Sequence, residues 1–182
     1  NGANLGQLGN RSMVTNGSMQ VAQRGTSFTG VTSTSAYHID RFETGSGDSS
    51  SQFTVSQATA GLNGFASSIK FDCTTAQSSL GADSRVFLQH KFEGRDLQQL
   101  KKGTSDAEKI TISFYVKSTK TGTYIVELYD NDNNRQISQA YTISSSGTWE
   151  QKTLTFDGDT TGAFNNDNAL SLTLYWHLVE GT

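Results

Sequence analysis

The stretch that decides the fold is Ile110-Thr111-Ile112-Ser113-Phe114-Tyr115-Val116-Lys117. Apolar and polar side chains alternate along it with a period of two, which is typical of a strand with one buried face and one wet face. The same alternation recurs on both sides of it in the chain, around residues 53–56, 69–73, 86–91 and 170–178. Repeated alternation of this kind predicts an antiparallel β protein.

Short loops of Gly, Asn, Asp and Ser separate the alternating stretches, and proline is absent from all 182 residues. Residues 120–122, 131–134 and 145–147 have the length and composition of hairpin loops. The spacing predicts about nine or ten strands, the number expected of a jelly roll. We therefore expect an all-β, antiparallel two-sheet jelly-roll sandwich over residues 36–182.

Two segments depart from this pattern. Residues 1–35 are rich in Gly, Asn, Ser and Thr, and we expect an extended N-terminal arm with a short strand near residues 18–23. The first clear strand is expected at residues 37–42. Residues 96–102 predict one short helix, in which Asp96 caps the N-terminus, Leu97 and Leu100 share a face, and Gly103 follows the last turn.

Charge and composition exclude several classes of partner. The net charge of −3 leaves no basic surface for phosphates, so we expect no nucleic-acid partner. No run approaches the ~18 apolar residues of a membrane span, so we expect none. The one cysteine, Cys73, excludes an intramolecular disulfide and fits synthesis in a reducing cytoplasm.

Sequence motifs for catalysis are missing from the chain. There is no nucleophile elbow, no zinc-binding His-Glu-x-x-His and no phosphate-binding glycine-rich loop. His38, His90 and His177 lie far apart in sequence and are interpreted as packing or surface residues. We therefore predict no enzymatic activity, no catalytic residue and no cofactor.

One acidic loop invites a metal interpretation. Asp130-Asn131-Asp132-Asn133-Asn134 offers the oxygen ligands that calcium prefers. It lacks the bidentate Glu and the Gly of a calcium loop, so a hairpin turn is the favoured interpretation and a calcium loop is the alternative. We assign no metal ligand.

A candidate binding site follows from the polar side of the alternation. If the apolar residues point inward, Lys117 and six others point outward, and these six form the candidate site on one sheet surface: Tyr115, Glu127, Tyr129, Tyr175, His177 and Gln89. Tyrosine rings with hydrogen-bonding groups between them suit the apolar faces and hydroxyl edges of sugar rings. The alternatives are the ordinary β-propensity of tyrosine, or a face covered by a neighbouring subunit or by the N-terminal arm.

Several stretches together resemble one family of domains. These are NGSMQVAQRG (16–25), YHIDRF (37–42), HKFEGRDL (90–97), ISFYVKS (112–118), TGTY (121–124), GTWE (147–150) and FDGDTTG (156–162). In order and spacing they resemble the jelly-roll domain of bacteriophage tail-fibre and other virion proteins. Its fold is similar to that of carbohydrate-binding modules attached to xylanases and related hydrolases.

The resemblance implies a virion structural protein, acting in assembly and possible host-surface attachment. It implies a location in the virion and partners that are other virion subunits, with a homo-oligomer, a trimer being favoured, and a cell-surface glycan as a further partner. The alternative function is a carbohydrate-binding module that uses the tyrosine-bearing sheet face. The resemblance itself supplies no binding residues.

Overall fold

The computed structural model describes residues 12–32, 35–47 and 51–181. Within these residues the chain forms eleven strands and one short 3₁₀ helix, η2 (Gly94–Leu100). The strands are β1 (Ser27–Val31), β2 (Ala36–Ile39), β3 (Phe42–Ser46), β4 (Gln52–Leu62), β5 (Phe65–Thr75), β6 (Arg85–Glu93), β7 (Ile110–Val116), β8 (Gly122–Asp130), β9 (Arg135–Ile143), β10 (Glu150–Phe156) and β11 (Leu170–Glu180).

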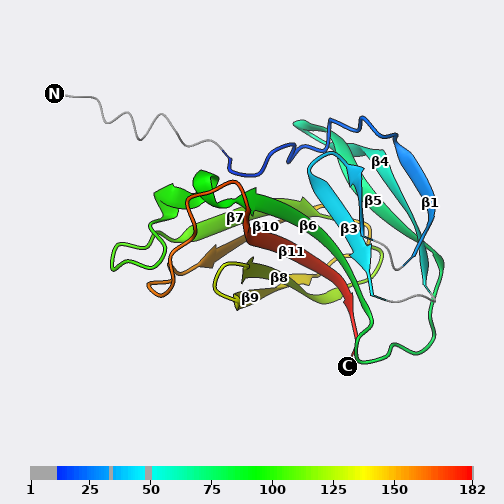
Figure 1. Cartoon of the computed structure of the whole chain (residues 1–182). Coiled ribbons are helices and arrows are strands. Elements are labelled where there is room, and N and C mark those ends of the chain that lie inside the picture. The colour runs from blue at the N-terminus through cyan, green and yellow to red at the C-terminus, as the bar shows by residue number, and fades with distance from the viewer. Residues whose placement is uncertain (1–11, 33–34, 48–50, 182) are drawn as a thin grey trace.

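The strands form antiparallel sheets that are arranged in two layers (Figure 1). One layer is a six-stranded sheet in the order β2-β3-β6-β11-β8-β9. The other layer contains a three-stranded sheet, β1-β4-β5, and a two-stranded sheet, β10-β7. The predicted all-β antiparallel sandwich is confirmed, although the second layer is divided into two sheets where one was expected.

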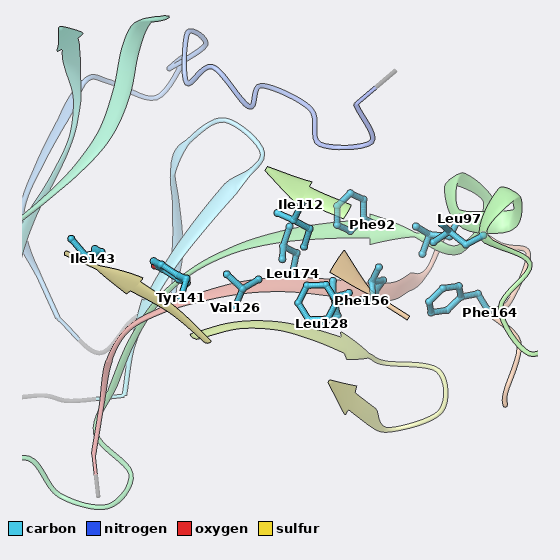
Figure 2. Packing of buried hydrophobic residues seen from close by; sticks show 12 residues of the cluster. Phe92, Leu97, Ile112, Val126, Leu128, Tyr141, Ile143, Phe156, Phe164 and Leu174 are labelled. Atoms are coloured by element: carbon cyan, nitrogen blue, oxygen red, sulfur yellow. The ribbon is translucent and has the colours of Figure 1, made fainter. Parts of the chain in front are cut away.

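The core lies between the layers because each long strand turns one apolar face inward. Ile112 and Phe156 of the two-stranded sheet pack in one cluster with Leu174 of the six-stranded sheet (Figure 2). A second cluster joins Val55 of β4 to Val86 of β6. Both smaller sheets therefore pack on the same face of the six-stranded sheet, whose other face we call the outer face.

The single helix forms close to its predicted place, with a different start. It begins at Gly94, so Asp96 lies in its first turn and Glu93 occupies the N-cap position without a side-chain cap. Leu97 and Leu100 are buried as expected, and Lys101 ends the helix in the left-handed conformation. No helix in the described part of the chain is long and apolar enough to cross a membrane.

The N-terminal segment from residue 12 to residue 32 lies against the sandwich (Figure 1). Five of its side chains pack against the core clusters: Met13, Val14, Met19, Ala22 and Val31. Its strand β1 pairs with β4. The expected strand at residues 18–23 is wrong, because Asn16 has φ 59° and its side chain bonds the backbone of Val21 in a turn. Residues 1–11 lie outside the described residues.

The stretch expected as one strand at residues 37–42 is instead a hairpin of β2 and β3. Asp40 and Arg41 form its turn, in which Arg41 has φ 72°. The N-terminal segment fixes this turn. The Asn16 side-chain amide donates to the Asp40 carbonyl (2.9 Å), and the backbone N–H of Gln23 donates to the Asp40 carboxylate (2.6 Å).

Candidate functional site

The outer face of the six-stranded sheet carries a row of polar and aromatic side chains. Residues that face each other across an antiparallel pair point to the same side of the sheet. The strand register aligns one residue from every strand: Tyr37, Glu43, Gln89, Tyr175, Glu127 and Ser138. Tyr129 lies opposite Thr173 in the next row, and His177 lies opposite Phe87 in the row on the other side.

The structure thus brings five of the six sequence-selected residues onto one face, and it separates the sixth. Tyr115 lies on β7, in the two-stranded sheet of the other layer. Its ring contacts Phe65 of β5 at 5.4 Å, and its hydroxyl donates to Gln151 Oε1 at 3.4 Å. The expectation that Tyr115 shares a surface with Tyr129 and Tyr175 is wrong, because alternation predicts which way a residue points but not which sheet its strand joins.

Tyr175 lies at the centre of the outer face. Its ring packs edge-on against Phe87 (centroids 5.3 Å apart) and stacks on the His177 ring (5.6 Å). Burial raises the pKa of the Tyr175 hydroxyl, and the charge of Glu127 adds to this effect. The ring is therefore held in a fixed orientation with a neutral hydroxyl.

Two ion pairs hold the carboxylates of the row. Lys91 Nζ lies 2.5 Å from Glu43 Oε2, and His177 Nε2 lies 3.2 Å from Glu127 Oε2. Burial lowers the pKa of Lys91, but the hydrogen bond and charge of Glu43 outweigh it, so the pKa is raised. Burial also lowers the pKa of His177, but Glu127 and Glu180 outweigh it and the pKa is again raised.

Gln89 has an unsatisfied acceptor at the middle of the row. Its side chain is buried (4% exposed), and its Oε1 has no hydrogen-bond partner among the described residues. A buried acceptor without a partner costs about 1–3 kcal/mol. Because Gln89 lies buried between Glu43 and Tyr175, a ligand hydroxyl would satisfy this oxygen only where the neighbouring side chains move apart to admit it.

Sequence reasoning missed several members of this face, among them Tyr37, Glu43, Phe87 and Lys91. Phe87 and Lys91 lie on the polar side of the alternation around Gln89, so the pattern contained a signal for them. Tyr37 and Glu43 carried no such signal. The turn between β2 and β3 has no Gly, Asn or Pro at Arg41 to mark a hairpin.

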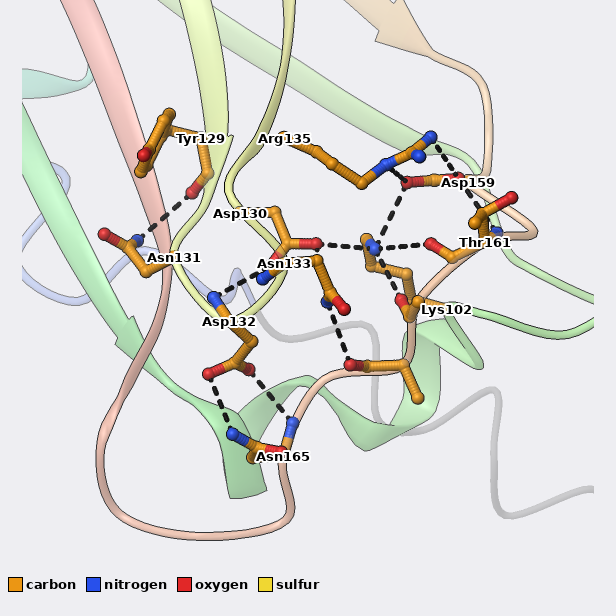
Figure 3. Close-up of polar contacts among 12 residues, drawn as sticks. Lys102, Tyr129, Asp130, Asn131, Asp132, Asn133, Arg135, Asp159, Thr161 and Asn165 are labelled. Carbon is orange, nitrogen blue, oxygen red and sulfur yellow. Dashed lines mark hydrogen bonds and ion pairs between the residues drawn. The ribbon is translucent and has the colours of Figure 1, made fainter.

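The acidic loop at residues 130–134 holds a lysine ammonium (Figure 3). Lys102 Nζ lies 2.6 Å from Asp130 Oδ2 and 3.2 Å from Asp159 Oδ2. It also donates to the carbonyls of Thr161 (3.0 Å) and Gly162 (2.5 Å). The oxygen ligands that suggested calcium thus surround a cation from the chain itself.

The rest of this loop is a hydrogen-bonded turn. Asp130 Oδ1 accepts from the backbone N–H groups of Asp132 and Asn133, both at 3.0 Å. Arg135 forms a two-pronged contact with Asp159 (3.0 and 3.2 Å). Among the residues that the structure describes, no group of three or more His, Cys, Asp or Glu side chains could hold a metal ion. The geometry fits the favoured hairpin interpretation.

Comparisons with known proteins give a likeness of fold. No protein-family model matches the chain, and a search of curated proteins found no match. Among solved structures, the chain is similar to the enzymatically active domain of tailspike protein 4 from bacteriophage CBA120. The likeness has a TM-score of 0.49 and 14% sequence identity, and it covers 93% of this chain. The chain spans 20% of the length of that tailspike chain.

Proposed function

We propose that this β sandwich is a recognition domain of a virion tail or fibre protein, and that it binds a saccharide on the outer face of the six-stranded sheet. The observation that carries the binding proposal is the row across this face, with the buried and unpartnered Gln89 Oε1 beside the Tyr175 ring. A sugar hydroxyl that enters between the neighbouring side chains can donate to this buried amide oxygen, while a sugar ring packs on the aromatic group.

The surroundings of Tyr175 support a sugar in particular. Carbohydrate recognition needs aromatic rings next to groups that accept and donate hydrogen bonds. Here the carboxylates of Glu43 and Glu127 flank Gln89 and Tyr175 in the same row. Lys91 and His177 keep these carboxylates in place, so the acceptors are preorganised for hydroxyl groups.

The arrangement of the acids supports binding in preference to hydrolysis. Glu43 and Glu127 are three strand spacings apart, which is about 14 Å at the backbone. Pairs of carboxylates that cleave glycosidic bonds lie about 5–9.5 Å apart. Glu43 and Glu127 are also each engaged in an ion pair. We therefore propose a domain that holds its ligand without cleaving it.

The virion part of the proposal rests on the sequence resemblance of residues 16–178 to tail-fibre domains. It places the domain in the particle, with other virion subunits as partners and a homotrimer as the favoured assembly. Multi-angle light scattering of the purified chain tests the assembly, for which a trimer mass is expected. A monomer at all concentrations would contradict this part of the proposal and leave saccharide binding standing.

A glycan array followed by calorimetry tests the saccharide site. Gln89→Met removes the unpartnered oxygen at similar volume, so the melting temperature should hold while affinity falls about tenfold. Tyr175→Ala should abolish the array signal. The matched controls are Gln151→Met and Tyr115→Ala, which change the same residue types on the other layer and should leave binding intact. An empty array, or equal losses in the controls, would overturn the proposal.

A further inference from the structure

Two adjoining cavities lie at the edge of the outer face, where the N-terminal segment, the β2–β3 turn and β6 meet. Their volumes are about 380 and 260 Å³, and both are lined by Arg41, Lys91 and Phe92. The larger one lies within the range of about 300–1,000 Å³ that is usual for small-molecule sites. Because Tyr37 and Lys91 also belong to the outer face, the larger cavity is continuous with the proposed saccharide site.

The larger cavity combines an aromatic ring with cations. Tyr37 is 38% exposed, and the Arg24 guanidinium and the Lys91 ammonium lie 5.8 and 5.9 Å from its ring centroid. Leu170, which is equally exposed, lines the same cavity. A sugar ring placed on Tyr37 would therefore have positive charge beside it.

Most charges around this cavity already have partners. Arg24 lies 3.7 Å from Asp40, Lys91 lies 2.5 Å from Glu43, and Arg95 lies 3.0 Å from Glu93. These pairs neutralise both acids of the larger cavity, Asp40 and Glu93. A third acid, Asp96, lines the smaller cavity instead.

Arg41 is the exception among the lysines and arginines that line these cavities. Its guanidinium makes no ion pair or hydrogen bond with any residue that the structure describes. An anion can bind to it without breaking an existing pair, and a guanidinium takes a carboxylate through two parallel hydrogen bonds.

The backbone of Arg41 gives a second, independent observation. Arg41 has φ 72°, a conformation that Gly or Asn adopts at lower cost. Strained residues of this kind concentrate at functional sites, where the side chain matters more than the backbone energy. Asn16 and Gln23 hold the turn in place, so the guanidinium is presented from a fixed backbone.

We infer that this cavity binds the carboxylate of an acidic sugar, with Arg41 as its partner and Tyr37 under the sugar ring. The inference rests on the proposed saccharide function and names the class of saccharide. A uronic acid residue fits, because it joins a pyranose ring to a carboxylate. Neighbouring sugars of the chain would extend from the cavity across the row toward Gln89 and Tyr175.

Calorimetry with tetragalacturonate and its fully methyl-esterified form tests this inference. The wild-type chain should bind the acid about tenfold more tightly than the ester, because only the ionised carboxylate can form charge-assisted hydrogen bonds with Arg41. Arg41→Gln keeps a polar side chain but removes the charge, so it should lose the preference for the acid over the ester. Lys120→Gln, in the β7–β8 turn outside both cavities, is the control and should keep the preference.

The outcomes separate this inference from the function on which it rests. Equal affinity of the wild type for acid and ester, or a preference retained by Arg41→Gln, would overturn the acidic site and leave saccharide binding standing. Failure of both oligosaccharides and of the whole array would overturn the function itself. Displacement of tetragalacturonate by inorganic phosphate at matched ionic strength would mark a general anion site and would overturn the sugar assignment.

Discussion

Lys102 and Asp130 form a buried ion pair, in which the ammonium lies 2.6 Å from the carboxylate and the side chains are 10% and 6% exposed. Lys102→Met would leave Asp130 buried without its cation. Breaking such a pair from one side costs about 3–5 kcal/mol, so we expect a loss of this order in the free energy of unfolding by urea. Lys101→Met is the matched control. The Lys101 ammonium forms an exposed pair with Glu108, so this variant should lose much less free energy of unfolding than Lys102→Met. Equal losses in both variants would contradict the role of Lys102.

Arg41→Gly should make the protein more stable. A non-glycine residue in the left-handed conformation costs about 1–2 kcal/mol relative to the ordinary one, and glycine removes this cost. Part of the gain is lost because glycine gives the unfolded chain more freedom, so we expect a net gain of about 1 kcal/mol in urea unfolding. A stability below that of wild type would show that the Arg41 side chain contributes to the fold, which the acidic-site inference does not require.

His177 should make the folded protein less stable as the pH rises above neutrality. Its folded pKa is raised above the ordinary value of 6.5, because Glu127 and Glu180 outweigh the effect of burial. The stability that its charge contributes is therefore fully present below pH 6.5 and is lost as the pH rises through the folded pKa. The melting-temperature difference between wild type and His177→Gln should shrink over that window. A difference that is constant from pH 6 to about pH 9 would contradict the ion pairs.

His90 should make the folded protein less stable as the pH falls below neutrality. Burial, and then the charge of Arg41, lower its pKa from 6.5 to about 4. Between pH 6.5 and 4, His90 is protonated in the unfolded chain but stays neutral in the folded chain. The free energy of unfolding therefore falls as the pH drops through this range. The ring is 1% exposed, and its Nε2 accepts from the backbone N–H of Thr15.

His90→Gln tests this prediction, because Gln keeps an acceptor for Thr15 but does not titrate in this range. The variant should lose less stability than wild type between pH 6.5 and 4, measured by urea unfolding at each pH. Burial also lowers the pKa of His38, so part of the loss should remain in the variant. Parallel curves for the two proteins would contradict a buried neutral His90.

The sequence predicted the parts of this structure that depend on neighbouring residues. Alternation along one strand correctly placed Gln89, Glu127 and Tyr175 on the polar side, because successive side chains in a strand point to opposite faces. It could not tell that Tyr115 belongs to the other layer, since strand order is decided by packing between segments that are distant in sequence. Tyr115 is the one member of the candidate site that this packing separates from the others.

Two other departures also depend on residues that are distant in sequence. The hairpin at Asp40 was missed because Arg41 adopts a conformation that sequence rules reserve for Gly, Asn or Asp. The ion in the acidic loop was not visible in the loop itself, because it is the side chain of Lys102, which follows η2. In each case a contact from elsewhere in the chain decides the local structure.

Lys102 also makes the loops at this end of the sandwich independent of the calcium concentration. A cation that is bonded to the polypeptide cannot be diluted away or removed by a chelator, whereas a calcium ion in the same cage could be. Loops that meet around Lys102 therefore keep their arrangement in calcium-poor water, and EDTA should leave the melting temperature unchanged. The cation that organises these loops is therefore a covalent part of the chain, and no ion has to be taken up from solution.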